Sequence, residues 1–253
     1  MILTAILAAA LVATSPAPAP KLAVPAEVLN CGLDKGADSS ICRALAAQKA
    51  GRPADAAAEF EGAAASAGAD DPRTSRLLAA AGNMWIAAGQ PGKAAVALDR
   101  ALAGKGLFAE QQGEALLDRA RAAEAQGDLK TARVKLKLAA ESIADDPFYW
   151  YFSAALAVRE ADVPTAKLAI ARALTLAPAD PTILFEAGHV ASLGGEDAKA
   201  REYWIRAAAA DPNGPSGKAA REALAMSPAP LTVTNQIATR PDGDGEGGAT
   251  PKN

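Results

Sequence analysis

Five segments of the chain share one spacing of small and large apolar residues. In each segment a turn residue is followed by alanine five positions later, a large apolar residue four positions beyond it and a second alanine three positions further on. The segments begin at Gly51, Gly89, Gly127, Ala161 and Gly195, which lie 38, 38, 34 and 34 residues apart. A period of this length predicts a solenoid of stacked helical hairpins, because one hairpin cannot bury its apolar stripe alone. The large apolar residues are Phe60, Leu98, Leu136, Ile170 and Trp204.

Turn and capping residues divide each repeat into two helices. Asp146-Pro147 and Asp180-Pro181 precede apolar-periodic runs, where Asp accepts hydrogen bonds from free amides and Pro needs no amide partner. Short Gly-rich or Pro-containing breaks interrupt each repeat. We therefore expect first helices near 40–50, 74–88, 111–126, 148–160 and 182–193, and second helices near 54–67, 92–104, 129–143, 164–176 and 197–209. An amphipathic stretch over 216–226 is expected to cap the stack.

The fifth repeat carries the pattern of a known repeat family. Its residues are Leu184, Ala187, Gly188 and Ala191, followed by Ala200, Trp204, Ala207 and Pro212. They resemble the tetratricopeptide repeat, in which a large residue, a hydrophobe, a glycine and an aromatic residue precede alanine, an aromatic residue, alanine and proline. The resemblance extends over residues 37–214. It implies an all-α, right-handed α-solenoid of about five hairpins and a role in binding protein partners.

The two ends of the chain differ from the repeats. Residues 2–12 are apolar and uncharged and precede a Pro-rich stretch, a pattern that resembles a bacterial-type secretory signal peptide. The pattern predicts export to the periplasm or the medium; an apolar leader without an export function is the alternative. We divide the chain into a leader and linker over 1–20, an N-terminal segment over 21–36, the solenoid with its capping helix over 37–226 and a tail over 227–253. The tail is expected to be disordered, because its apolar content is too low to offset ordering entropy.

Cys31 and Cys42 are the only cysteines of the chain. In an oxidising compartment an even cysteine count favours a disulfide. A bridge here would tie the N-terminal segment across the open end of the solenoid. Two independent, reduced thiols are the alternative.

Charge and composition argue against a nucleic-acid partner and for closely packed helices. The chain has 26 Lys and Arg against 29 Asp and Glu, so it lacks the basic excess that nucleic-acid binding requires. Only 4% of its residues are aromatic although 50% are hydrophobic, which favours many thin helices over a bulky globular core.

One run of aromatic residues is the strongest candidate for a binding surface. The chain has five Phe, three Tyr and three Trp residues, and five of these eleven aromatic residues stand at positions 148–152. A helix cannot bury five consecutive rings on one face, so we expect Trp150 to point inward and Phe148 and Tyr151 to face the concave groove. There Phe185 can join them, and rings with a polar handle are good anchors for a partner. Packing between adjacent repeats is the alternative role.

The family resemblance implies that one side of each first helix lines this groove. The residues at the matching positions are Asn83, Arg121, Glu124, Phe148, Tyr151, Ala155, Phe185 and His189. The basic residues with which the family holds a C-terminal carboxylate are missing as a set, since Ala79, Leu117 and Asp118 stand at companion positions. We expect Arg121 and Glu124 to form a solvated pair within one helix.

The sequence contains no catalytic or metal-binding pattern. His189 is the only histidine and the cysteines stand at the far end of the chain, so no zinc signature is present. Ser192 lies one helical turn from His189 without a third member for a triad. Asn253 replaces the bidentate Glu that a calcium loop starting at Asp242 would need. We therefore expect no enzyme activity, no cofactor and no metal.

These observations favour a non-catalytic module that binds a peptide or a protein segment of an envelope complex in its concave groove. One alternative is an assembly protein that self-associates through the ends or the convex face of the solenoid. An enzymatic or glycan-binding role is a further alternative, which would need a closed pocket with converging polar groups.

Overall fold

The computed structural model of the protein describes Cys31 and residues 36–227. These residues form eleven α-helices and no β-strand. The helices are α1 (Ala37–Lys49), α2 (Pro53–Ala67), α3 (Arg73–Ala87), α4 (Pro91–Ala103), α5 (Ala109–Ala125), α6 (Leu129–Ile143), α7 (Pro147–Arg159), α8 (Val163–Leu176), α9 (Pro181–Leu193), α10 (Asp197–Ala210) and α11 (Pro215–Met226).

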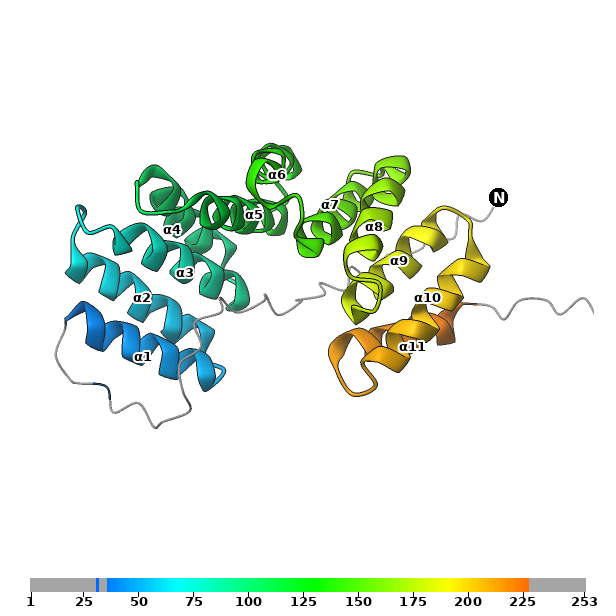
Figure 1. The fold of residues 1–253 in the computed structure, drawn as a ribbon. Coiled ribbons are helices and arrows are strands. Elements are labelled where there is room, and N and C mark those ends of the chain that lie inside the picture. Colours follow the sequence, from blue (N-terminus) through cyan, green and yellow to red (C-terminus); the bar gives the residue numbers. More distant parts are fainter. Residues whose placement is uncertain (1–30, 32–35, 228–253) are drawn as a thin grey trace, which may run out of the picture.

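Consecutive helices pair into hairpins that stack along an arch (Figure 1). Five hairpins run from α1–α2 to α9–α10, and α11 packs against the last of them. From α3 onward the odd-numbered helices contact one another across neighbouring hairpins, whereas the even-numbered helices chiefly contact the helices next to them in sequence. The odd-numbered helices therefore form the inner face of the arch, and the even-numbered helices form its outer face.

The predicted all-α solenoid with a C-terminal capping helix is confirmed. Every helix begins and ends within three residues of its predicted bounds. The largest difference is at α1, which begins at Ala37 instead of residue 40. Its N-cap is Gly36, which makes no side-chain capping bond, so no capping residue marks this start in the sequence.

Alanine and glycine allow the two helices of each hairpin to approach closely. The repeat alanines Ala94, Ala132 and Ala166 have no exposed surface. A Cβ added at Gly188 would lie 2.2 Å from Nε1 of Trp204, so only glycine fits against that ring. The large apolar residue of every repeat is buried and fills the remaining space, as the spacing predicts.

The geometry of the turn after each first helix explains why the repeat pattern begins with glycine in four of the five repeats. The amide of Gln90 donates to the carbonyl of Trp85 at 2.9 Å, which forces positive φ on Gly89, and the other four repeats close in the same way. Ala161, at φ 59°, is the one non-glycine residue with positive φ in the described part of the chain. An L-residue pays about 1–2 kcal/mol for this conformation, which is why glycine occupies the other four turns.

The described residues cover the solenoid and little else. The predicted leader and linker over 1–20, most of the segment over 21–36 and the tail over 228–253 lie outside them. Among the described helices, none has the length and apolar character needed to cross a membrane.

Candidate interaction groove

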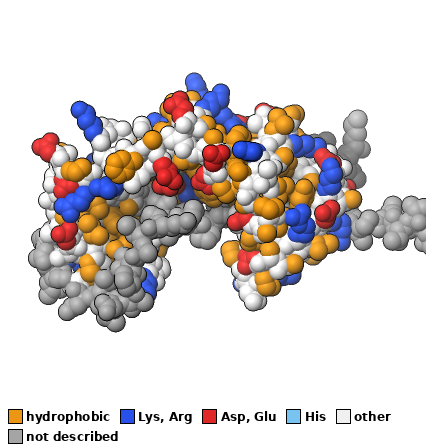
Figure 2. Space-filling view, in the orientation of Figure 1, with side chains coloured by type: hydrophobic (Ala, Val, Ile, Leu, Met, Phe, Trp, Pro, Cys, Tyr) orange, Lys and Arg blue, Asp and Glu red, His pale blue; other side chains and the backbone are white. Residues whose placement is uncertain are grey.

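Equivalent residues of the odd-numbered helices line the inside of the arch. Asn83, Arg121, Ala155 and His189 each lie six residues before the turn residue of their repeat. Because successive first helices present the same register, these positions share one face. Figure 2 shows the hollow that the two ends of the arch enclose.

A series of polar and cation–π contacts links α3, α5 and α7 along the groove. Nδ2 of Asn83 donates to Oδ2 of Asp118 at 2.7 Å, and Nη1 of Arg121 donates to Oδ1 of the same carboxylate at 2.8 Å. The side chains of Arg121 and Asp118 are only 11% and 15% exposed. The Arg121 guanidinium carbon lies 5.3 Å from the centre of the Phe148 ring, within the range of a cation–π interaction. The contacts fix the relative positions of three consecutive first helices.

The predicted pair of Arg121 with Glu124 is wrong. Arg121 pairs with Asp118 of its own helix, and Glu124 pairs with Arg159 of α7. Asp118 and Glu124 both lie three residues from Arg121, so spacing along the helix could not distinguish them. The neighbouring helix decides, because it brings Arg159 to Glu124.

The aromatic run divides between core and groove. Tyr149 and Phe152 are the most buried rings of the run, each 7% exposed, and they pack with Leu156 on one side of α7. Phe148 and Tyr151 are only partly buried, and their ring centroids lie 5.3 Å apart. This pair is the aromatic surface beside the Arg121 guanidinium.

Trp150, which was expected to point inward, lies at the edge of the core. It is partly buried, and its indole N–H donates to the carbonyl of Ala144 at 2.7 Å. The Trp150 ring is not buried more deeply because its indole N–H needs a hydrogen-bond acceptor. The carbonyl that accepts this bond belongs to the turn before α7. Trp150 nevertheless packs against two core clusters, beside the more deeply buried Tyr149 and Phe152.

In α9, the first helix of the fifth hairpin, two rings and a carboxylate lie close together. The ring centroids of Phe185 and His189 lie 5.1 Å apart, and Nδ1 of His189 lies 3.9 Å from Oε2 of Glu186. The nearby Glu186 carboxylate raises the pKa of His189 above 6.5, against the opposing effect of burial. This end of the groove gains positive charge as the pH falls.

An acidic row on α5 was not singled out from the sequence. Glu110, Glu114 and Asp118 follow one another at four-residue intervals, so they lie on one side of the helix. Partial burial raises the pKa of Glu114, and the charges of Glu110, Asp118 and Asp146 raise it further. The four-residue spacing was the signal that could have identified this row.

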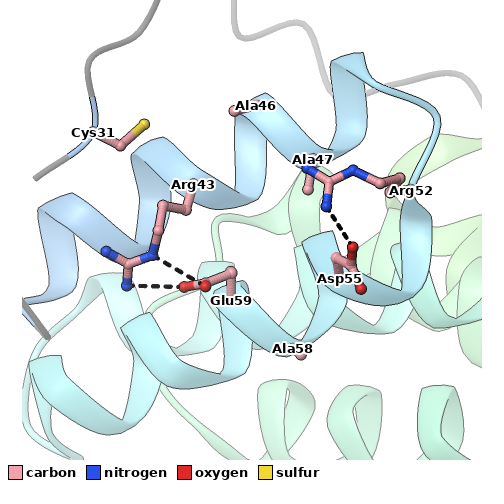
Figure 3. Close-up of a pocket in the computed structure, with 8 residues that line it drawn as sticks. All are labelled: Cys31, Arg43, Ala46, Ala47, Arg52, Asp55, Ala58 and Glu59. Carbon is pink, nitrogen blue, oxygen red and sulfur yellow. Dashed lines mark hydrogen bonds and ion pairs between the residues drawn. The ribbon is translucent and has the colours of Figure 1, made fainter. Parts of the chain in front are cut away.

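A separate hollow of about 720 Å³ lies at the N-terminal end of the arch, between α1 and α2 (Figure 3). Nε of Arg43 donates to Oε1 of Glu59 at 3.0 Å, and Nη1 of Arg52 donates to Oδ2 of Asp55 at 2.7 Å. Cys31 lines the hollow and is bridged to Cys42 of α1. The charged groups that line the hollow pair with one another, and the disulfide fastens one point of the N-terminal segment to the first helix.

The described residues hold no group of three or more His, Cys, Asp or Glu side chains that could bind a metal ion. Oδ1 of Asn83 is the one buried side-chain oxygen or nitrogen among them that lacks a hydrogen-bond partner.

No family model and no curated protein matches the sequence. Solved structures do match its fold. PilW, described as a widely conserved type IV pilus biogenesis factor, aligns with a TM-score of 0.60 and 17% identity over 73% of this chain and 82% of its own. PilF of Pseudomonas aeruginosa aligns with a TM-score of 0.59 and 17% identity, over 76% and 82%. YrrB, described as a TPR protein with an unusual peptide-binding site, gives 0.53 and 18%, over 76% and 93%.

The chain has the tetratricopeptide-repeat (TPR) fold. The predicted resemblance is thus confirmed at the level of structure, although identities of 14–18% carry no more than the fold. In the TPR frame, α3, α5, α7 and α9 are the first helices that line the groove, and α4, α6, α8 and α10 are the second helices.

Proposed function

We propose that this TPR protein is a non-catalytic interaction module that binds an extended segment of an envelope protein in its concave groove. The observation that carries the proposal is the continuous set of contacts from Asn83 through Asp118 and Arg121 to Phe148. It holds three helices in place beside the partly exposed Phe148 and Tyr151 rings, and preorganised aromatic surfaces are the usual anchors of binding energy.

The comparisons support an interaction or scaffold role. YrrB is described as having a peptide-binding site, and PilW as a pilus biogenesis factor. The apolar run over 2–12 supports an envelope location, because it resembles a signal peptide. A non-catalytic role is supported by two carboxylates of the groove, Asp118 and Glu124, which pair with arginines.

Site-specific photocrosslinking tests this proposal. A photoreactive residue placed at Ala155, which lies on the concave face between Arg121 and His189, should crosslink a distinct protein in cells. The matched control is Ala171, an exposed alanine on the outer side of α8. Equal crosslinking from both positions would contradict the groove as the binding surface.

Tyr151→Ala separates binding from packing in the same assay. If the Tyr151 ring anchors a partner, the crosslink from position 155 is lost while the melting temperature hardly changes. Tyr151→Phe is the control, because it keeps the ring and should keep most of the crosslink. A large fall in melting temperature with an unchanged crosslink would assign the ring to the fold. A crosslinked product of twice the chain mass would favour self-assembly instead.

A further inference from the structure

The inner and outer faces of the C-terminal hairpins differ in charge. The second helices α6, α8 and α10 carry nine Lys and Arg against three Asp and Glu. The first helices α5, α7 and α9 carry three Arg against five Asp and Glu. Basic side chains are therefore concentrated on the outside of the arch, although the whole chain has a net charge of −3.

Large apolar side chains are exposed on the same outer helices. Val134 and Leu138 of α6 are 52% and 43% exposed, Leu168 of α8 is 76% exposed, and Ile205 of α10 is 55% exposed. Buried core residues of these helices, such as Leu136 and Ile170, are 1% and 6% exposed. The exposed residues thus point away from the stack and are available to something outside it.

The repeat places these residues in register. Val134 and Leu168 are 34 residues apart, and so are Leu138, Arg172 and Arg206, which follow one helical turn later on successive second helices. Lys137 stands between the two apolar residues of α6 and has no ion-pair partner among the described residues. Arg172 lies 3.8 Å from the exposed Asp145, Arg206 donates to the carbonyl of Pro178, and the exposed Glu202 holds the register position of Leu168 on α10. We define the outer ridge as Val134, Lys137, Leu138, Leu168, Arg172 and Arg206. At the top of the arch in Figure 2, Lys and Arg side chains stand next to apolar patches over α6.

We propose that the outer ridge docks the protein on the surface of a bilayer that contains anionic lipid. Basic residues near such a surface are attracted to the lipid headgroups, and adjacent apolar side chains gain by entering the interfacial region. Exposed apolar surface beside an excess of basic side chains is typical of such docking faces.

The shape of the ridge favours a bilayer over a protein partner. The apolar side chains of the outer ridge stand on separate helices of a convex face. The anchor side chains of a protein interface are usually clustered in one patch. Fluid lipids adapt to separate side chains and need no pocket. Docking through the outer ridge would leave the concave groove facing away from the membrane, so it is compatible with a partner in the groove and independent of it.

Vesicle flotation with the full chain tests the proposal. The protein should float with vesicles of phosphatidylglycerol and phosphatidylcholine and not with vesicles of phosphatidylcholine alone. Binding should fall steeply at about 1 M salt, where the screening length is about 3 Å. Each variant retains residues 2–12, so differences between variants report on the ridge and not on that apolar run.

Paired variants locate the contact. Lys137→Gln with Arg172→Gln should weaken binding about 25-fold, since each basic side chain near an anionic surface is worth about fivefold. Lys218→Gln with Arg221→Gln removes the same charge from exposed positions of α11 and should have little effect. Leu168→Ser should weaken binding about tenfold, whereas Met226→Ser, at a residue 75% exposed on α11, should not.

Three results would overturn the proposal. The first is no preference for anionic vesicles, and the second is an equal loss in the ridge and α11 variants. The third is binding to an acidic polypeptide such as polyglutamate through the ridge without vesicle binding, which would make the ridge a protein-binding face. None of these results bears on crosslinking from the groove, so the two proposals fail separately.

Discussion

The second and fifth hairpins carry the same repeat pattern but pack differently. In α3–α4 the glycine of the first helix, Gly82, faces Leu98, and in α9–α10 the equivalent Gly188 faces Trp204. A Cβ added at Gly82 would lie 2.4 Å from Cγ of Leu98, and one added at Gly188 would lie 2.2 Å from Nε1 of Trp204. The leucine can move by changing rotamer. The indole cannot, because it is a rigid ring whose N–H donates to the carbonyl of Phe185 at 3.2 Å.

The comparison shows that glycine at this position can face side chains that differ in how far they can move. The third and fourth hairpins have Ala120 and Ala154 at the same position, both without exposed surface. Their facing residues, Leu136 and Ile170, leave room for one methyl group. Close packing of this kind is specific to each hairpin, although the sequence period is common to all of them.

Removing the Trp204 ring should have the largest effect. Trp204→Ala is expected to cost about 3–5 kcal/mol, because the ring is 5% exposed and is the largest side chain between α9 and α10. Thermal unfolding should show a fall in melting temperature of about 10 °C. A shift of less than a couple of degrees would contradict the assignment of Trp204 as the anchor of the fifth hairpin.

Adding one methyl group at each glycine tests the comparison directly. Gly188→Ala should destabilise the protein by about 1–3 kcal/mol, because the indole cannot move away. Gly82→Ala should cost less, since Leu98 can shift and alanine favours the helix by about 0.5–1 kcal/mol.

The combination with Trp204→Leu provides the control. In that background the fifth hairpin has the leucine of the second, and Gly188→Ala should then cost no more than Gly82→Ala. Equal costs for the two glycine variants in the wild-type background, measured by urea unfolding, would remove the distinction between the hairpins.

Most of the fold could be predicted because its signals are local. The turn residues, the capping Asp-Pro pairs and the spaced alanines each specify a few residues of backbone, and their repetition specifies the stack. The start of α1 was less well predicted, because Gly36 offers no side chain that signals a cap.

The repeat predicts which residues share the face of the groove, but it does not predict which side chains contact one another. The repeat places Asn83, Arg121 and His189 on one face, but it does not say which carboxylate Arg121 meets. Asp118 and Glu124 are equally spaced from it, and Arg159 on another helix settles the pairing. The position of Trp150 depends likewise on the Ala144 carbonyl, which no pattern in the sequence identifies.

The starts of the first helices give a smaller test of the same comparison. Asp180 accepts hydrogen bonds from the amides of Thr182 at 2.8 Å and Ile183 at 3.0 Å, whereas Asp71 accepts one backbone amide bond, from Arg73 at 2.7 Å. Asp180→Ala should cost about 1 kcal/mol, and Asp71→Ala should cost less. Asp→Asn at each site keeps an acceptor and is the control in chemical unfolding. A larger cost at Asp71 would show that its side-chain pair with Arg73 outweighs the missing second amide.

The smallest expected difference concerns pH, because His189 of the fifth hairpin stands where the second has Asn83, which does not titrate. The carboxylate of Glu186 raises the pKa of His189 above 6.5, so the protonated ring favours the folded state. Its contribution to stability is complete below the unfolded pKa and is lost as the pH rises through the higher, folded value. The effect on stability is small since the side chain is half exposed, so an NMR titration of the imidazole is the better measurement. Its midpoint should lie above 6.5 and fall in Glu186→Gln, while Asp118→Asn, which alters the partner of Asn83, should leave it unchanged. A midpoint at or below 6.5 in the wild-type protein would show that burial, and not Glu186, dominates at this end of the groove.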